Sequence, residues 1–228
     1  MDIVDLYSLF RREVRDLVTP YFWSDEEIYA YMNEAQNMFC RLQGGIADST
    51  SVAAQIGVSS GDAFSDIHPR VLKIRHAQLA SNNRELELLN FEDLETRVSC
   101  DDYGQRSGFK LDSTEGPVKA MVLGMEPTKV RLLNIPQEDD TINLIVYRLP
   151  LEEITIPIGA QPLEIPEQHQ RSLLYWMKAL AYEKQDAETY DRGKAVEFGE
   201  KFRAYCDQAK AERERSEHKY RATAYGGL

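Results

Sequence analysis

Adjacent acidic residues are the side chains of this sequence best suited, by type, to catalysis. Three such pairs occur, at Asp101-Asp102, Asp139-Asp140 and Glu152-Glu153. Two carboxyl groups that flank one glycosidic bond and differ in pKa can act as the acid and the base of glycan hydrolysis. Adjacent acids in polar segments are more often turn residues that face water. A tail-associated hydrolase of cell-wall glycan is therefore an alternative interpretation and not the favoured one.

The histidines and cysteines lack the spacing of a metal site. The histidines are His68, His76, His169 and His218, and the cysteines are Cys40, Cys100 and Cys206. If His68 and His76 lay on one extended strand, they would be about 26 Å apart, too far to share a metal ion. Three cysteines cannot all pair within one chain, and these are too far apart in sequence for a metal knuckle.

Motifs of the common enzyme classes are absent from the sequence. It has no Gly-rich phosphate loop, no nucleophile elbow and no zinc-protease helix. We therefore predict no catalytic, cofactor-binding or metal-binding residue, no cofactor, and a protein that is not an enzyme. A weak hydrolase activity is left open.

The charge balance limits the partners. Lys and Arg number 27 against 38 Asp and Glu, which gives a net charge of −11 and a pI near 4.9. Ordinary nucleic-acid binding needs cations that displace phosphate counterions, so this balance argues against it. The acidic start predicts no signal peptide, and the longest apolar stretch, 173–182, is too short to span a membrane. We expect a protein of the reducing cytosol.

Helical patterns occupy the first 49 residues. The first predicted helix covers roughly residues 3–18, with Leu17 on its apolar stripe, and Thr19-Pro20 ends it. A capping box at 24–27 (Ser-Asp-Glu-Glu), flanked by apolar Trp23 and Ile28, starts the second helix. Gly44-Gly45 ends that helix.

The pattern then changes to short strands and turns. Strands are predicted over 52–58, 71–77, 85–89, 118–123, 129–133 and 141–147, and a turn over 61–66. A proline-rich connector, 150–166, leads to a helix that opens at Pro166, and Asp186 is expected to cap the last helix.

The predicted fold class is α+β: a mainly helical core of two N-terminal and two C-terminal helices, with an inserted antiparallel β module. The expected domains are an N-terminal helical pair (1–49), a β module with loops (50–165), a C-terminal helical pair packed on the first (166–216) and an extended tail (217–228). The tail has no core of its own to join, so it is either frayed or docked on a partner. Its candidate partner-binding residues are Tyr220, Arg221, Tyr225 and Leu228.

Two segments resemble the head-to-tail adaptor (connector) proteins of tailed bacteriophages, including the tail accessory factors of short-tailed phages. The first is WSDEEI at 23–28, continuing to NEAQ at 33–36. The second runs from Pro166 through His169, Leu173, Leu174, Trp176 and Ala179 to DAET at 186–189. The order and spacing of the two segments, with β patterns between them, carry the resemblance.

The resemblance implies a structural virion protein at the head-tail junction, assembled in the host cytoplasm. Such adaptors form a ring, usually a dodecamer, under the portal protein and join it to tail or nozzle proteins. Double-stranded DNA would pass through the channel during ejection without specific binding, and an acidic lumen would repel it. The 217–228 tail would grip the portal, and no membrane is involved. A cellular, non-viral scaffold protein is a further alternative.

Overall fold

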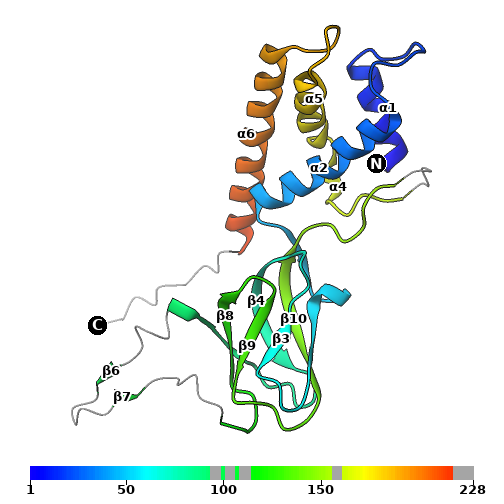
Figure 1. The fold of residues 1–228 in the computed structure, drawn as a ribbon. Helices are drawn as coiled ribbons and strands as arrows, with labels where there is room; N and C mark the ends of the chain where they lie inside the picture. The colour runs from blue at the N-terminus through cyan, green and yellow to red at the C-terminus, as the bar shows by residue number, and fades with distance from the viewer. Residues whose placement is uncertain (93–98, 101–105, 108–113, 156–160, 218–228) are drawn as a thin grey trace, which may run out of the picture. The chain divides into compact units, whose positions relative to one another are not determined.

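The computed structural model describes residues 1–92, 99–100, 106–107, 114–155 and 161–217 of the chain. The chain divides into two compact units, which are coloured by residue number in Figure 1. We call residues 1–45 and 150–228 the helical unit, and residues 46–149 the β unit. Each unit is described by itself.

Helix α5 lies at the centre of the helical unit and packs against three other helices, α1, α2 and α6 (Figure 1). The helices of the described residues are α1 (Ile3–Glu13), α2 (Asp25–Gln43), α4 (Glu167–Gln170), α5 (Leu173–Glu183) and α6 (Arg192–Glu217). The large side chains that they bury completely include Leu6, Phe10, Ile28, Met32, Phe39 and Phe202. These residues repeat at helical spacing, so one apolar stripe of each helix faces the shared core.

Local capping sets where these helices begin and end. The predicted capping box of α2 is confirmed: the Ser24 hydroxyl accepts from the Glu27 amide at 3.2 Å, and the Glu27 carboxylate accepts from the Ser24 amide at 2.8 Å. Gly44 ends α2 with a φ of 96°, a conformation that suits glycine. Two other predicted ends are wrong. Helix α1 stops at Glu13 and not near residue 18, and Asp191, not Asp186, accepts from the first turn of α6 at 3.1 Å.

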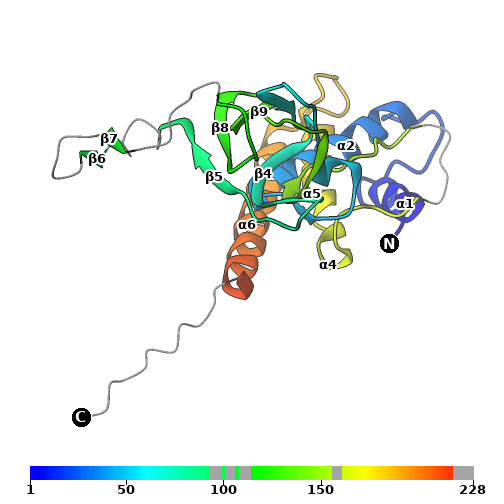
Figure 2. The same ribbon diagram turned by 90° about the horizontal axis from the view of Figure 1, so that it is seen from below.

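The β unit holds two four-stranded sheets (Figures 1 and 2). In the first, β10 (Asp140–Arg148) pairs with β1 (Ile46–Asp48), β2 (Gln55–Val58) and β4 (Val71–Leu79). The second has the order β3 (Phe64–Asp66), β9 (Lys129–Leu133), β8 (Ala120–Glu126) and β5 (Glu87–Asn90). A one-turn 3-10 helix, η1 (Val52–Ala54), precedes β2, and β6 (Ser99–Cys100) pairs with β7 (Arg106–Ser107).

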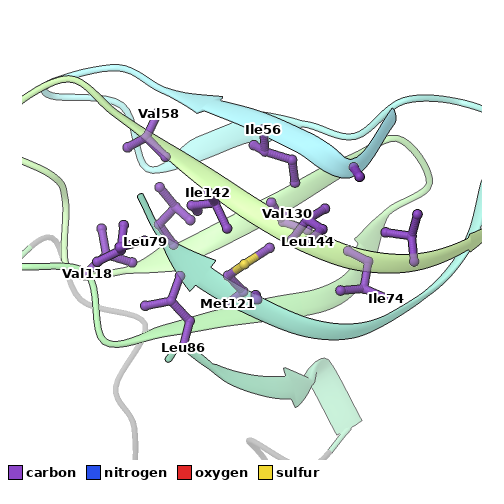
Figure 3. Packing of buried hydrophobic residues seen from close by; sticks show 14 residues of the cluster. Ile56, Val58, Ile74, Leu79, Leu86, Val118, Met121, Val130, Ile142 and Leu144 are labelled. Carbon is purple, nitrogen blue, oxygen red and sulfur yellow. The ribbon is translucent and has the colours of Figure 1, made fainter. Parts of the chain in front are cut away.

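Inward-facing side chains from both sheets form one apolar core, shown in Figure 3. Ile142 and Leu144 of β10 alternate with outward residues, and they meet Met121 and Val130 from the second sheet. Alternation of this kind is the period of a strand with one buried face. The chain passes from one sheet to the other where the Leu86 amide donates to the Ala77 carbonyl at 2.9 Å.

The predicted fold class is therefore wrong in its emphasis, although both helices and strands are present. The β part is a substantial unit with its own core, and the helices are not the main core. It is also not purely antiparallel, because β5 and β8 pair in parallel. The predicted turn over 61–66 contains strand β3. Short strands that gain their partners from distant parts of the chain carry a weak local signal, so the sequence patterns understated them.

Candidate interaction surfaces

A buried arginine holds both ends of the loop between α1 and α2. One Arg11 nitrogen donates to Asp16 at 2.7 Å, and another donates to Asp25 at 2.5 Å. The other carboxylate oxygen of Asp16 accepts from the Phe22 amide at 3.0 Å. The side chain of Asp16 is 1% exposed, so this is a charge pair inside the protein that fixes the path of residues 14–24.

The start of α2 is held electrostatically as well. The Asp25 carboxylate accepts from the Tyr7 hydroxyl at 2.5 Å, and this bond, followed by the one from Arg11, lowers the pKa of Asp25. Burial tends to raise the pKa of Glu27, but the bonds from Lys184 and Ser24 outweigh it and leave that pKa lowered. Both carboxylates also lie in the first turn of the helix, where its dipole favours negative charge.

The loop that these contacts fix exposes large apolar side chains. Leu17 is 64% exposed and Val18 is 78% exposed, while Tyr21 and Phe22 are nearly half exposed. We call residues 17–22 the apolar loop. Tyr21 covers the Arg11 guanidinium at 3.9 Å, and Phe22 packs edge-on against Trp23. The base of the loop is therefore packed, and its tip, Leu17-Val18, faces outward.

A groove of about 380 Å³ lies between α5 and α6. We call it the α5–α6 groove. Small residues make the groove possible. Its lining includes Ala179, Ala195 and Gly199, and longer side chains at these positions would fill the space between the two helices. Tyr190 and Val196, each 52% exposed, stand at its edge. Glu183, Arg192, Glu200 and Arg203 line it as well, so the groove is a hollow of mixed polar and apolar character on the surface of the helical unit.

The β unit has a groove of about 450 Å³ that opens into its core. Four partly buried side chains of that core line it: Ile67, Val71, Leu88 and Leu123. Here β4 and β5 diverge after the Ala77–Leu86 hydrogen bond. The groove therefore lies beside side chains of β4, β5 and β8 that are only partly buried against the core.

Within the part of the chain that the structure describes, the acidic pairs suggested for catalysis belong to different units. Asp139 accepts from the Ser60 amide at 2.7 Å and directly precedes β10, and Asp140, the first residue of β10, accepts from the Ser81 hydroxyl at 2.6 Å. Positions 101–102 lie outside the described residues, and Glu152 and Glu153 are exposed. Within the described part of the chain, no three metal-ligating side chains gather at one place. No helix in that part is long and apolar enough to span a membrane.

The histidine and cysteine side chains that the structure describes are either buried or make local polar contacts. His169 is buried and contacts the Tyr205 hydroxyl through Nδ1 at 3.1 Å. His76 lies 3.2 Å from Glu85 on the β unit, and the His68 ring accepts from the Arg70 amide. Burial raises the pKa of the Cys206 thiol to about 12, so this thiol is unreactive at neutral pH. Cys40 is buried in α2, and His218 lies outside the described residues.

The proposed tail residues Tyr220, Arg221, Tyr225 and Leu228 lie outside the described residues. The apolar loop and the α5–α6 groove are the surfaces that sequence patterns missed. Leu17 fell on the predicted stripe of the first helix, but it is exposed because α1 ends four residues earlier. A glycine inside a predicted helix, Gly199, was the available signal for the groove.

Comparison with known families gives a match over almost the whole chain. The family model described as "SU10 adaptor protein" matches residues 1–224. The match spans both the helical unit and the β unit. No curated protein matches the chain.

Proposed function

The chain belongs to the SU10 adaptor protein family, which confirms the resemblance to phage head-to-tail adaptors, and from this premise we propose how it acts. An adaptor family implies a structural, non-enzymatic virion component that contacts other phage head and tail proteins. We propose that copies of this chain form a ring under the portal protein and join it to tail or nozzle proteins. The observation that carries the proposal is the match itself, because it includes both units.

The surfaces of the helical unit support a binding role. A chain that works alone rarely leaves several large apolar side chains together in water. This unit shows an apolar loop, and two large apolar side chains are exposed at the edge of the α5–α6 groove. The base of the loop is fixed by the Arg11 hydrogen bonds to Asp16 and Asp25.

We also propose that the 217–228 tail docks on the portal. Helix α6 buries apolar residues as far as Ala209, and after that its anchor is Arg213, which donates to Gln43 at 2.8 Å and to the Gly45 carbonyl. Residues 214–216 are exposed. The helix therefore leads away from its own core toward the tail, and Tyr220, Arg221, Tyr225 and Leu228 would supply the contacts.

The charge of the chain suits a protein beside moving DNA. Each copy carries a net −11, and a ring multiplies that charge. An acidic channel wall repels the phosphate backbone, so DNA would pass through without being held.

Sedimentation velocity of the chain, alone and with the portal protein of the same genome, tests the proposal. We expect a small species that becomes a ring-sized complex on the portal. Deletion of 217–228 should leave the circular dichroism spectrum of the fold intact and weaken portal binding. Absence of any complex between the full chain and the portal would contradict the adaptor proposal, and unchanged binding after the deletion would contradict the role of the tail alone.

A further inference from the structure

Two peptide connections join the helical unit to the β unit. One lies between Gly45 and Ile46, and the other lies between Leu149 and Pro150. The first follows two consecutive glycines, Gly44 and Gly45, and both have a φ of 96°. Glycine adopts this left-handed conformation as readily as it adopts others, so the pair gives the chain more conformational freedom than other residue types would. The Gly44-Gly45 pair can therefore act as a hinge wherever side chains do not restrain it.

The side chain of Arg213, near the end of α6, restrains this hinge (Figure 1). Its guanidinium donates to the Gln43 side-chain oxygen at 2.8 Å and to the Gly45 carbonyl at 3.2 Å. It also lies directly against Gly44, because a Cβ added to that residue would overlap the guanidinium. Arg213 thus contacts three consecutive residues, which are the last three of the helical unit before the chain enters the β unit. A side chain of α6 therefore holds the path of the chain at the hinge.

The second connection is held by other side chains of the helical unit. The Glu164 carboxylate accepts from the Leu151 amide at 2.6 Å and from the Glu152 amide at 3.0 Å. The Asn33 side chain exchanges two hydrogen bonds, each of 2.9 Å, with the backbone of Ile154. These contacts come from α2 and from the segment before α4, so they differ from the contact at the hinge, which comes from α6. The position of α6 therefore bears on the glycine connection in particular.

Arg213 lies where α6 has few apolar contacts with its own core. Among the described residues, the last apolar side chain that α6 buries is Ala209, one turn earlier, and residues 214–216 are exposed. Helix ends with few buried apolar contacts open locally at a low free-energy cost. The restraint on the hinge therefore depends on whether the end of α6 stays helical, and a partner that binds the chain beyond this end would stabilise it.

We propose that Arg213 is a latch on the Gly44-Gly45 hinge. With the latch closed, the β unit has few orientations relative to the helical unit, and with the latch open, the two glycines allow many. A partner that binds the 217–228 tail holds the last turns of α6 and so keeps the latch closed. This effect of a partner rests on the proposed docking of the tail on the portal, whereas the latch itself rests on contacts within the helical unit. The β unit would thus gain a fixed orientation when the chain binds the portal.

Distances between two spin labels on the full chain measure the freedom of the hinge. In a Cys100→Ser background, Ser8→Cys places one label on α1, and Asn143→Cys places the other on β10. Both positions are exposed, and the two remaining native cysteines are buried, so the labels attach at the new positions. A closed latch gives a narrow distribution of distances between the labels, and an open latch gives a broad one.

Two substitutions open the latch from opposite sides. Arg213→Ala should raise the ratio of the broad to the narrow population about tenfold or more, because it removes hydrogen bonds from a charged donor. Gln43→Met removes one acceptor without changing α6, so it should act in the same direction and less strongly. Arg215→Ala is the matched control, because Arg215 is exposed two residues further along α6 and should leave the ratio unchanged. If Arg213→Ala and Gln43→Met both keep the wild-type distribution, the latch is overturned.

The same labels on portal-bound chain test the effect of a partner, with an excess of unlabelled chain to remove distances between subunits. Portal binding should reduce the broad population of the wild type and of Gln43→Met, which keeps the bond to Gly45, but not that of Arg213→Ala. An equal reduction in Arg213→Ala would overturn the coupling through the latch. Sedimentation of the same samples reports portal binding itself, and its absence for the wild type would contradict the adaptor proposal, while the free chain still tests the latch.

Discussion

The two units of this protein are stabilised in different ways. The β unit encloses an apolar core built from both sheets, and its prominent ion pair, Arg148–Asp48, lies at the end of β10. The helical unit surrounds its core with polar side chains that are themselves buried, among them Arg11, Asp16, Lys178 and His169. These groups bind the loop and the helix ends in place. Among the residues that the structure describes, the helical unit therefore buries more ionisable side chains than the β unit does.

Exposed apolar residues follow the same division. On the helical unit they form the apolar loop and the edge of the α5–α6 groove. On the β unit Val52, Phe64, Leu72 and Ile145 belong to different elements, and its groove opens into its own core. Four predictions test the contrast between the units, and both tryptophans, Trp23 and Trp176, report on the helical unit alone.

The largest effect is expected for Arg11→Ala. It would leave Asp16 buried without its cation, a change that typically costs about 3–5 kcal/mol. Urea unfolding followed by tryptophan fluorescence measures the loss in the helical unit. Lys201→Ala is the control, because the Lys201–Glu197 pair is exposed to solvent and should contribute little to stability. A loss for Arg11→Ala no larger than that of the control would show that the network does not stabilise the unit.

Leu144→Ala should have the next largest effect, and it should act on the β unit. Leu144 is 1% exposed in the apolar core, and deletion of a buried leucine side chain costs about 3 kcal/mol. Hydrogen exchange of the β10 amides, which pair with three neighbouring strands, measures this loss. If the units are stabilised separately, the fluorescence transition stays at its wild-type urea concentration. A shift of that transition by the same free energy would contradict separate stabilisation.

Ser24→Ala should cost the helical unit about 1 kcal/mol, because it removes one half of the α2 capping box. Ser51→Ala removes a similar cap from η1 in the β unit, and that element is only three residues long. The urea concentration at the midpoint of the fluorescence transition should therefore fall for Ser24→Ala and stay unchanged for Ser51→Ala. Equal shifts of that midpoint for both variants would contradict the prediction that the α2 cap stabilises the helical unit specifically.

Local patterns in the sequence were enough to predict part of this fold. The capping box at Ser24–Glu27 fixes where α2 starts, and Gly44 fixes where it ends, because both depend on neighbouring residues. Strands β9 and β10 were predicted within one residue at each end for a similar reason: their apolar residues alternate clearly. Features of this kind are decided within a few positions of the chain.

Features that depend on distant residues could not be predicted. The parallel pair β5–β8 joins segments separated by about thirty residues, and a parallel pair needs a long connection whose path no local pattern gives. The Arg11 network brings four residues of two helices and a loop together. Gly199 was visible as a helix glycine, but only the structure shows the open space beside it. The candidate tail residues stay a prediction.

The smallest predicted effect is a difference between the two units in how their stability depends on pH. Burial lowers the pKa of His169 below its ordinary 6.5, while Glu212 opposes this, and Gln168 and Tyr205 contact the ring. A group whose pKa is lower in the folded state than in the unfolded state contributes its full stabilisation when the pH is above the unfolded-state pKa. That stabilisation is lost as the pH falls through the folded-state pKa. The helical unit should thus begin to weaken as the pH falls below about 6.5, the ordinary pKa of histidine.

The β unit should respond only in stronger acid. Burial tends to raise the pKa of Asp48, but hydrogen bonds from Ser51 and Arg148 outweigh it and hold that pKa below its ordinary 3.8, so its stabilisation is lost only below about pH 4. Between pH 6.5 and 4.5, tryptophan fluorescence should report a weaker helical unit while β10 amide protection stays constant. His169→Gln removes the titrating ring and should flatten the fluorescence dependence over that range. A slope that His169→Gln leaves unchanged would assign the pH dependence to other groups of the helical unit.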